Sequence, residues 1–226
     1  MTLNISKYKT LIFDCDGVIL NSNQVKTNAF YKAALPYGKA LAEKLVEYHV
    51  NHGGISRYAK FEYFLKNIIP SDILEKNIFD SQLKVLLTSY AQLVHQGLLE
   101  CAVAPGLEEL RDLTLDTKWL IVSGGDQAEL NEIFSKRKLS NFFDGGIYGS
   151  PDTKDEILSR ETKNRNIIEP ALFLGDSKYD YEAATTANLD FIFLSDWSEV
   201  DNWEAWANAN NIKVLPSLNR LINHNL

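Results

Sequence analysis

The chain has 226 residues, a formal net charge of −7 and a hydrophobic fraction of 45%. This length suits one large domain or a core with an insertion, and the composition supports a packed globular core. A nucleic-acid partner is not expected, because phosphate contacts need clustered Lys and Arg. The N-terminus carries no apolar leader and no window is apolar enough to span a bilayer, so we expect a cytoplasmic protein with no membrane partner. The two cysteines, Cys15 and Cys101, are isolated and lack metal-type spacing, which fits a reducing compartment.

The first predicted strand, Thr10–Asp14, ends in a carboxylate, and Asp16 and Gly17 follow it. Ligands of an open α/β sheet bind beyond the carboxyl ends of the strands, so Asp14 and Asp16 are expected at a site edge. There, one carboxylate can attack an electrophile while the other handles the proton. The pair alone is a weak signal, because aspartate is common in turns.

Residues 21–96 predict an insertion of four or more helices. Apolar residues recur at helical spacing, as in Val25, Ala29, Phe30 and Ala33. Proline and glycine residues divide the region, and a helix start is expected at Ser71–Asp72. The many aromatic side chains of this region are expected in its core.

From Pro105 onward, predicted strands and helices alternate, which indicates a parallel sheet covered on both faces. The predicted strands are Lys118–Val122, Ala171–Gly175 and Leu189–Leu194; the predicted helices are Asp126–Lys138, capped by Asp126, Thr153–Arg165 and Tyr181–Asn188. Residues 141–149 are expected to form a loop with a short strand. The segment with Trp197, Trp203 and Trp206 is expected to cover the edge of the sheet.

Further polar residues lie where these strands end or helices begin. They are Ser123 and Gly124 in Ile121-Val122-Ser123-Gly124-Gly125, Lys154 near a helix start, and Asp176 and Asp180 after Leu172-Phe173-Leu174-Gly175. Each alone is compatible with a turn, a helix cap or a solvated surface. The ordered set of carboxylate pair, hydroxyl, lysine and carboxylate pair resembles the haloacid dehalogenase-like hydrolase superfamily over most of the chain. The resemblance implies an α/β fold: a Rossmann-like parallel-sheet core, residues 1–20 and 97–226, with an inserted α-helical cap, residues 21–96.

Four carboxylates at one sheet edge would disfavour joint ionisation, and Mg²⁺, which prefers oxygen ligands, would relieve the conflict. The resemblance implies the individual roles. Asp14 attacks phosphorus to form an aspartyl-phosphate, and Asp16 transfers the proton. Mg²⁺ is held by Asp14, Asp176 and the backbone carbonyl of Asp16. The remaining roles are phosphate binding by Ser123, Gly124 and Lys154, and orientation of Lys154 or a metal-bound water by Asp180.

The stretch Gly54-Ile55-Ser56-Arg57 resembles the cap loop of β-phosphoglucomutase-like members, where the loop faces the active site. Arg57 and His52 are therefore the candidate substrate-binding residues of the cap, because a guanidinium can bind an anionic group. The alternatives are that Arg57 is an exposed residue at a helix start and that His52 is structural.

These features predict a Mg²⁺-dependent phosphatase that acts on a small phosphorylated metabolite. The alternatives are a β-phosphoglucomutase-like phosphomutase and a non-catalytic binding domain. Dehalogenase and phosphonate-hydrolase activities are disfavoured, because members with those activities lack the second aspartate. The sequence leaves open the natural substrate and the oligomeric state.

Overall fold

The computed structural model describes residues 4–70 and 79–223. Within them, six strands form one parallel sheet in the order β3-β2-β1-β4-β5-β6. The strands are β1 (Thr10–Phe13), β2 (Lys118–Asp126), β3 (Gly146–Ser150), β4 (Ala171–Gly175), β5 (Asp190–Leu194) and β6 (Lys213–Leu215). The predicted α/β fold with a parallel sheet is confirmed.

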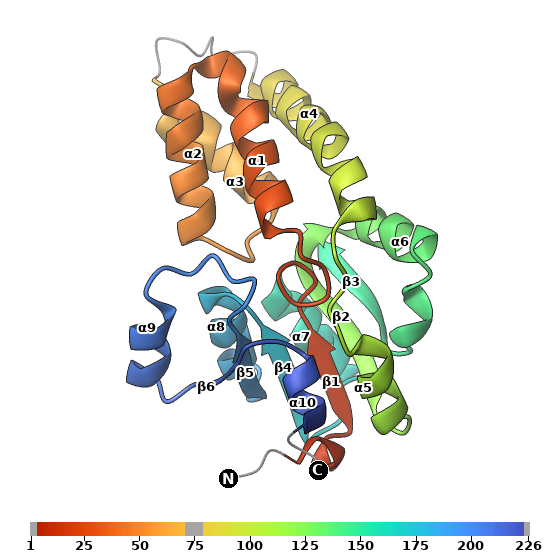
Figure 1. Cartoon of the computed structure of the whole chain (residues 1–226). Helices are drawn as coiled ribbons and strands as arrows, with labels where there is room; N and C mark the ends of the chain where they lie inside the picture. The colour runs from red at the N-terminus through yellow and green to blue at the C-terminus, as the bar shows by residue number, and fades with distance from the viewer. Residues whose placement is uncertain (1–3, 71–78, 224–226) are drawn as a thin grey trace.

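Helices cover both faces of the sheet, as Figure 1 shows. They are α5 (Leu107–Leu113), α6 (Gln127–Lys136), α7 (Lys154–Lys163), α8 (Lys178–Thr186), α9 (Trp203–Ala209) and α10 (Asn219–Asn223). Side chains of a strand alternate between the two faces, so Leu11 and Phe13 join one hydrophobic cluster and Ile12 joins another. Burial on both faces explains why these strands are nearly continuous apolar runs.

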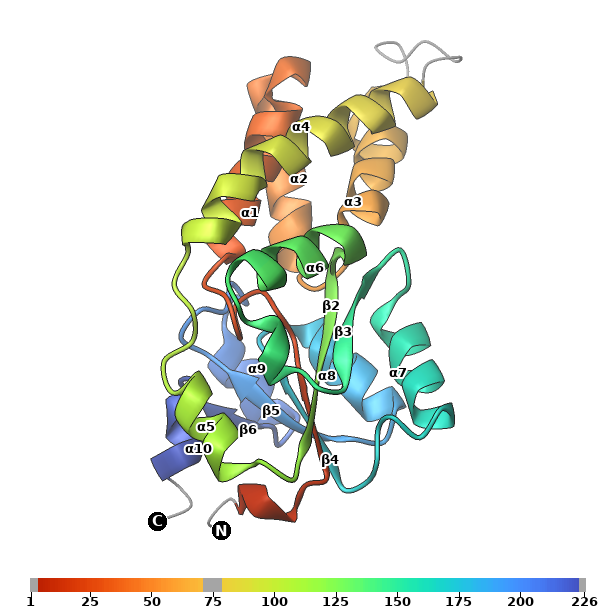
Figure 2. The same ribbon diagram turned by 90° about the vertical axis from the view of Figure 1, so that its right-hand side faces the viewer.

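The helices that the structure describes between β1 and α5 gather above the carboxyl ends of the strands (Figure 1). They are α1 (Asn23–Ala34), α2 (Lys39–Asn51), α3 (Arg57–Tyr63) and α4 (Phe79–Glu100), and a π-helical turn, Phe64–Ile68, follows α3. Turned by 90°, the molecule shows α6 directly below this group (Figure 2). The expected boundary at residue 96 falls inside α4. The division into core and cap stays a prediction, and we use the word cap for α1–α4 and their connections. The helix start expected at Ser71–Asp72 lies outside the described residues.

Several predicted element boundaries shift by a few residues. Strand β2 continues to Asp126, beyond its expected end at Val122, and α8 begins at Lys178, before the expected start. The predicted cap of α6 is confirmed, because the Asp126 side chain accepts a hydrogen bond from the backbone N–H of Glu129. Strand β6 and helices α9 and α10 had no strong periodic signal. Trp206 of α9 packs against Phe193 of β5, so this segment covers part of the sheet. In the described part of the chain, no helix is long and apolar enough to cross a membrane.

Candidate active site

The polar residues predicted to form a site meet at one edge of the sheet. Asp14 follows β1 directly and Asp176 follows β4, the strand paired with β1, so parallel pairing places both carboxylates side by side. Ser123 lies on β2, on the other side of β1, and Lys154 begins α7 after β3. The sheet order therefore brings together residues that are up to 162 positions apart in the sequence.

Lys154 is the buried cation of this edge. Its side chain is fully buried, its Nζ lies 3.0 Å from Asp14 Oδ1, and it forms an ion pair with Asp180. Burial alone would lower the pKa of Lys154, but the charges of Asp14 and Asp180 raise it. The second oxygen of Asp180 accepts hydrogen bonds from the backbone N–H groups of Asp176 and Ser177. Asp180 thus contacts both the amine of Lys154 and the loop that carries Asp176, and its expected role in orienting Lys154 or a metal-bound water stays a prediction.

The carboxylates of Asp14 and Asp176 are crowded and incompletely partnered. Oδ1 of Asp14 is buried and accepts no well-directed hydrogen bond, despite its closeness to Lys154. Burial raises the pKa of Asp14 to about 7, and burial with repulsion from Asp14 raises the pKa of Asp176 well above its usual range. Asp14, Asp176 and Asp180 can each place one oxygen within 4.8 Å of the others. A buried set of oxygen donors short of positive charge fits a hard divalent cation such as Mg²⁺.

Gly17 is required where the loop after β1 passes Asp176. Its φ of 75° favours glycine, and a Cβ there would lie 2.0 Å from Asp176 Oδ2. This close approach lets the loop that bears Asp16 cross the end of β4.

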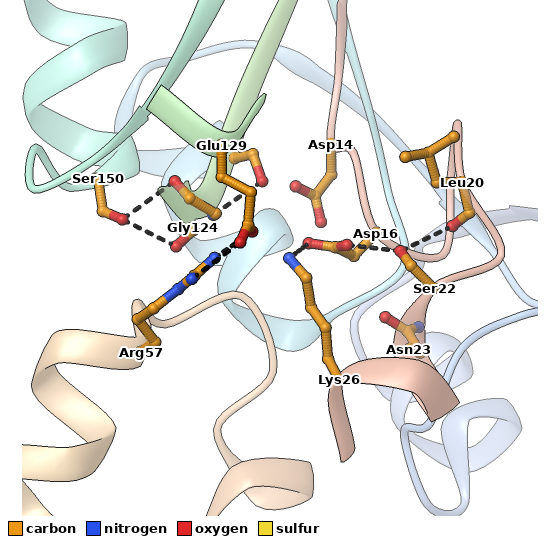
Figure 3. A network of polar contacts seen from close by, with 12 residues as sticks. Asp14, Asp16, Leu20, Ser22, Asn23, Lys26, Arg57, Gly124, Glu129 and Ser150 are labelled. Atoms are coloured by element: carbon orange, nitrogen blue, oxygen red, sulfur yellow. Dashed lines mark hydrogen bonds and ion pairs between the residues drawn. The ribbon is translucent and has the colours of Figure 1, made fainter. Parts of the chain in front are cut away.

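Asp16 is held by residues of the loop and of α1 (Figure 3). Its carboxylate forms an ion pair with Lys26 and accepts a 2.5 Å hydrogen bond from the Ser22 hydroxyl. Burial opposes ionisation, but Lys26 and Ser22 together lower the pKa of Asp16 below its usual value. In this conformation its side chain therefore faces the cap and lies outside the three-carboxylate cluster. The expected use of its backbone carbonyl as a metal ligand stays a prediction.

Ser123 and Gly124 lie where β2 reaches the cap. Ser123 is fully buried, and its Oγ accepts a hydrogen bond from the backbone N–H of Gly125. Gly124 borders the cavity and contacts the cap loop so closely that a Cβ there would lie 2.1 Å from the carbonyl oxygen of Gly54. Only glycine permits this approach, so the cap loop and the predicted phosphate-binding segment are in direct contact.

The two predicted cap residues have different positions. Arg57 begins α3 but is buried rather than exposed, and its guanidinium forms two hydrogen bonds with the Glu129 carboxylate of α6 (Figure 3). The next residue, Tyr58, donates a hydrogen bond to Asp126. Arg57 thus connects the cap to the core in this conformation. His52 is exposed, stacks on Tyr48 and lies outside the cavity next to Asp14.

A cavity of about 60 Å³ separates the carboxylates from the cap. Its cap wall contains three basic side chains that are not among the predicted site residues, Lys26, His49 and Lys60. Each lies within an apolar helical stripe; Lys26, for example, is in register with Ala29, Phe30 and Ala33. The signal available in the sequence was a basic residue at a helix position that is expected to be buried. The pattern of one helix does not show that these three residues face the same cavity, because that depends on how the three helices pack.

The fold and this sheet-edge site define a class of α/β hydrolases with an inserted cap. A model of the haloacid dehalogenase-like hydrolase family matches residues 11–194. The chain therefore belongs to the haloacid dehalogenase-like hydrolase family.

Three relatives illustrate the similarity. A phosphorylated carbohydrates phosphatase from Thermotoga maritima is 24% identical over 196 residues, which cover 82% of this chain and 84% of the relative. A hydrolase from Pseudomonas syringae is 22% identical, with a TM-score of 0.72 and coverage of 96% of this chain and 97% of that chain. A β-phosphoglucomutase from Clostridium difficile is 21% identical, with a TM-score of 0.69 and coverage of 94% and 92%. The two structural matches support the fold.

Proposed function

We propose that the protein is a Mg²⁺-dependent phosphatase that hydrolyses a small phosphorylated metabolite, with a phosphorylated carbohydrate as the leading class. The observation that carries the proposal is the position of Asp14, a buried carboxylate beside Lys154 with an oxygen that lacks a directed hydrogen bond. The family and the phosphatase from Thermotoga maritima support the same reaction class.

The proposed reaction has two displacements at phosphorus. The Asp14 carboxylate attacks phosphorus, the bond from phosphorus to the substrate oxygen breaks, and Asp16 gives that oxygen a proton. Water then attacks the aspartyl-phosphate, Asp16 accepts a proton from the water, and phosphate leaves with regeneration of the Asp14 carboxylate. Because Lys26 now holds Asp16 in its ionised form, we expect this ion pair to loosen when Asp16 has to carry the proton of the first step.

The surrounding residues would bind the transferred group. The cation of Lys154 faces Asp14 and is suited to attract phosphate oxygens, while the Ser123 hydroxyl proton and the Gly124 amide are the proposed neutral donors. Asp14 and Asp176 would hold Mg²⁺, which would neutralise the charge that accumulates between the carboxylates and the phosphate. The contact between Gly54 and Gly124 would keep bulk water out of the closed site.

The experiment is an assay of phosphate release from a panel of sugar phosphates, phosphorylated acids and an aryl phosphate, with and without Mg²⁺. We expect release with Mg²⁺ from the wild-type protein and none from Asp14→Asn. Isomerisation of a sugar phosphate without net release would instead favour the phosphomutase alternative. No reaction with any substrate, from a folded protein that contains Mg²⁺, would contradict an enzymatic role.

A further inference from the structure

Lys60 is a buried amine that forms no ion pair with any of the residues that the structure describes. It lies on α3, is 1% exposed and borders the cavity next to Asp14. Within the described residues, no carboxylate oxygen lies within 4 Å of its Nζ. The other cations of this wall differ, because Lys26 pairs with Asp16 and Arg57 pairs with Glu129. Burying an ammonium group without a counter-charge is costly, so this position needs an explanation.

A chain of hydrogen bonds holds the amine in place. Lys60 Nζ lies 2.6 Å from Nδ1 of His49, and Nε2 of His49 lies 3.1 Å from the hydroxyl of Thr27. Thr27 donates to Glu199, on the loop after β5. Donation from Lys60 to Nδ1 fixes the histidine tautomer with a proton on Nε2, so each link of the chain has one donor and one acceptor.

The chain leaves donor capacity on Lys60. An ammonium group has three N–H bonds. One reaches His49 Nδ1, and a second makes a long 3.4 Å contact with the His49 carbonyl oxygen. The third has no protein acceptor within hydrogen-bonding distance among the described residues, although Lys60 borders the cavity. The amine is therefore held in position and available to an acceptor that enters the cavity.

The surroundings favour an anionic acceptor. Burial, followed by repulsion from Lys26, lowers the pKa of Lys60 to about 7. A bound anion would offset both effects, whereas a neutral hydroxyl would relieve only part of the desolvation and none of the repulsion from Lys26. The opposite wall of the cavity carries Asp14, Asp16 and Asp176, so an anion is attracted to the cap side rather than to the carboxylate side.

We propose that Lys60, oriented by His49, is a specificity-determining residue that binds a second anionic group on the leaving part of the substrate. This inference rests on the proposed phosphatase function. It assigns the natural substrate to phosphorylated metabolites that carry a further carboxylate or phosphate.

The test compares substrates that differ in the second anion. The ratio of kcat/KM for 2-phosphoglycolate to kcat/KM for ethyl phosphate is measured for wild type, Lys60→Met and Lys66→Met. Lys66 is the matched control, because it lies on the same part of the cap but is exposed and paired with Glu62. We expect wild type and Lys66→Met to prefer phosphoglycolate, and the ratio to fall about 10- to 100-fold in Lys60→Met, the value of one charge-assisted hydrogen bond. The same ratio of kcat/KM values, measured for fructose 1,6-bisphosphate relative to fructose 6-phosphate, tests whether the second anion is a phosphate.

The outcomes separate this inference from the proposed function. A wild-type protein that hydrolyses an aryl phosphate but shows no preference for either anionic substrate overturns the role of Lys60 without any variant. An equal loss on both members of a pair in Lys60→Met also overturns it, since a structural role affects both alike. Lys60→Gln provides a second variant if Lys60→Met does not fold. Failure to release phosphate from any substrate, aryl phosphate included, contradicts the phosphatase function and the inference together.

Discussion

Lys60→Met should stabilise the substrate-free protein, and the gain should shrink as the pH rises. The amine has an ordinary pKa of 10.5 in the unfolded chain and a pKa lowered to about 7 in the folded protein. Folding therefore releases its proton between these two values, and the wild-type protein becomes more stable relative to the variant as the pH increases through this window. Burial is the main cause of the lowered pKa in the folded protein; the charged groups around the amine are Lys26, Asp16, Glu199 and Lys154, and His49 is in direct contact.

The shift sets the size of the effect. A difference of 3.5 pH units between pKa values of 10.5 and about 7 corresponds to about 5 kcal/mol for the fully protonated amine. The penalty in the wild-type protein is then about 4 kcal/mol at pH 7 and about 2 kcal/mol at pH 9. Methionine retains an apolar stem of similar length but leaves Nδ1 of His49 without its donor, a loss of about 1 kcal/mol. We therefore expect a net gain of about 3 kcal/mol at pH 7 and about 1 kcal/mol at pH 9.

The assay is urea unfolding at pH 7 and pH 9 for wild type, Lys60→Met and the control Lys66→Met, in buffers free of phosphate and carboxylate. The free energies of unfolding are compared between proteins whose m-values are equal, so that a difference reports a change in stability. The control should differ from wild type by the same small amount at both pH values. A difference between Lys60→Met and wild type that does not change with pH would refute the buried, proton-releasing amine. A variant that gains stability but loses substrate preference is the pattern expected of a residue retained for function.

Three further predictions concern the site. Chelation of divalent cations should stop phosphate release and Mg²⁺ should restore it; full turnover in excess chelator, with the metal content measured, would contradict a metal role for Asp176. Asp16→Asn should slow turnover by about 10²- to 10⁴-fold, with a smaller loss for an aryl phosphate whose leaving group needs less protonation, and equal losses across leaving groups would exclude proton transfer by Asp16. Arg57→Ala and Glu129→Gln should each weaken cap closure and lower kcat/KM for small and large substrates alike, while the double variant should lose little more than either single one. If Arg57→Ala lowered kcat/KM only for the natural substrate, Arg57 would instead be a substrate-binding residue.

The sequence predicted the parts of the site that depend on local patterns. An apolar run that ends in Asp14, and another that ends before Asp176, identify strand ends, and parallel pairing then places those ends at one edge of the sheet. Lys154 could be placed near the site because it follows a short strand and the capping residue Thr153. These signals need only a few consecutive residues, because the pairing of parallel strands then places the strand ends next to one another.

The cap–core contacts could not be predicted in this way. The partner of Arg57 is Glu129, 72 positions later, and neither residue carries a local pattern that selects the other. In the sequence, Lys60 and His49 look like ordinary polar residues. Packing of the helices buries both and places Nζ of Lys60 2.6 Å from Nδ1 of His49. Strand β6 was missed for a related reason, since three residues at a sheet edge give too little periodicity to distinguish them from a loop.

The most direct measurement is the mass of the peptide that contains Asp14 after wild-type protein, Mg²⁺ and an aryl phosphate are mixed and quenched rapidly in acid. The account predicts a peptide heavier by one phosphoryl group, with the fragment ions assigning the group to Asp14. The same peptide from Asp14→Asn, handled identically, should carry none. A phosphoryl group on another residue, or undiminished phosphate release by a folded Asp14→Asn protein, would contradict Asp14 as the nucleophile.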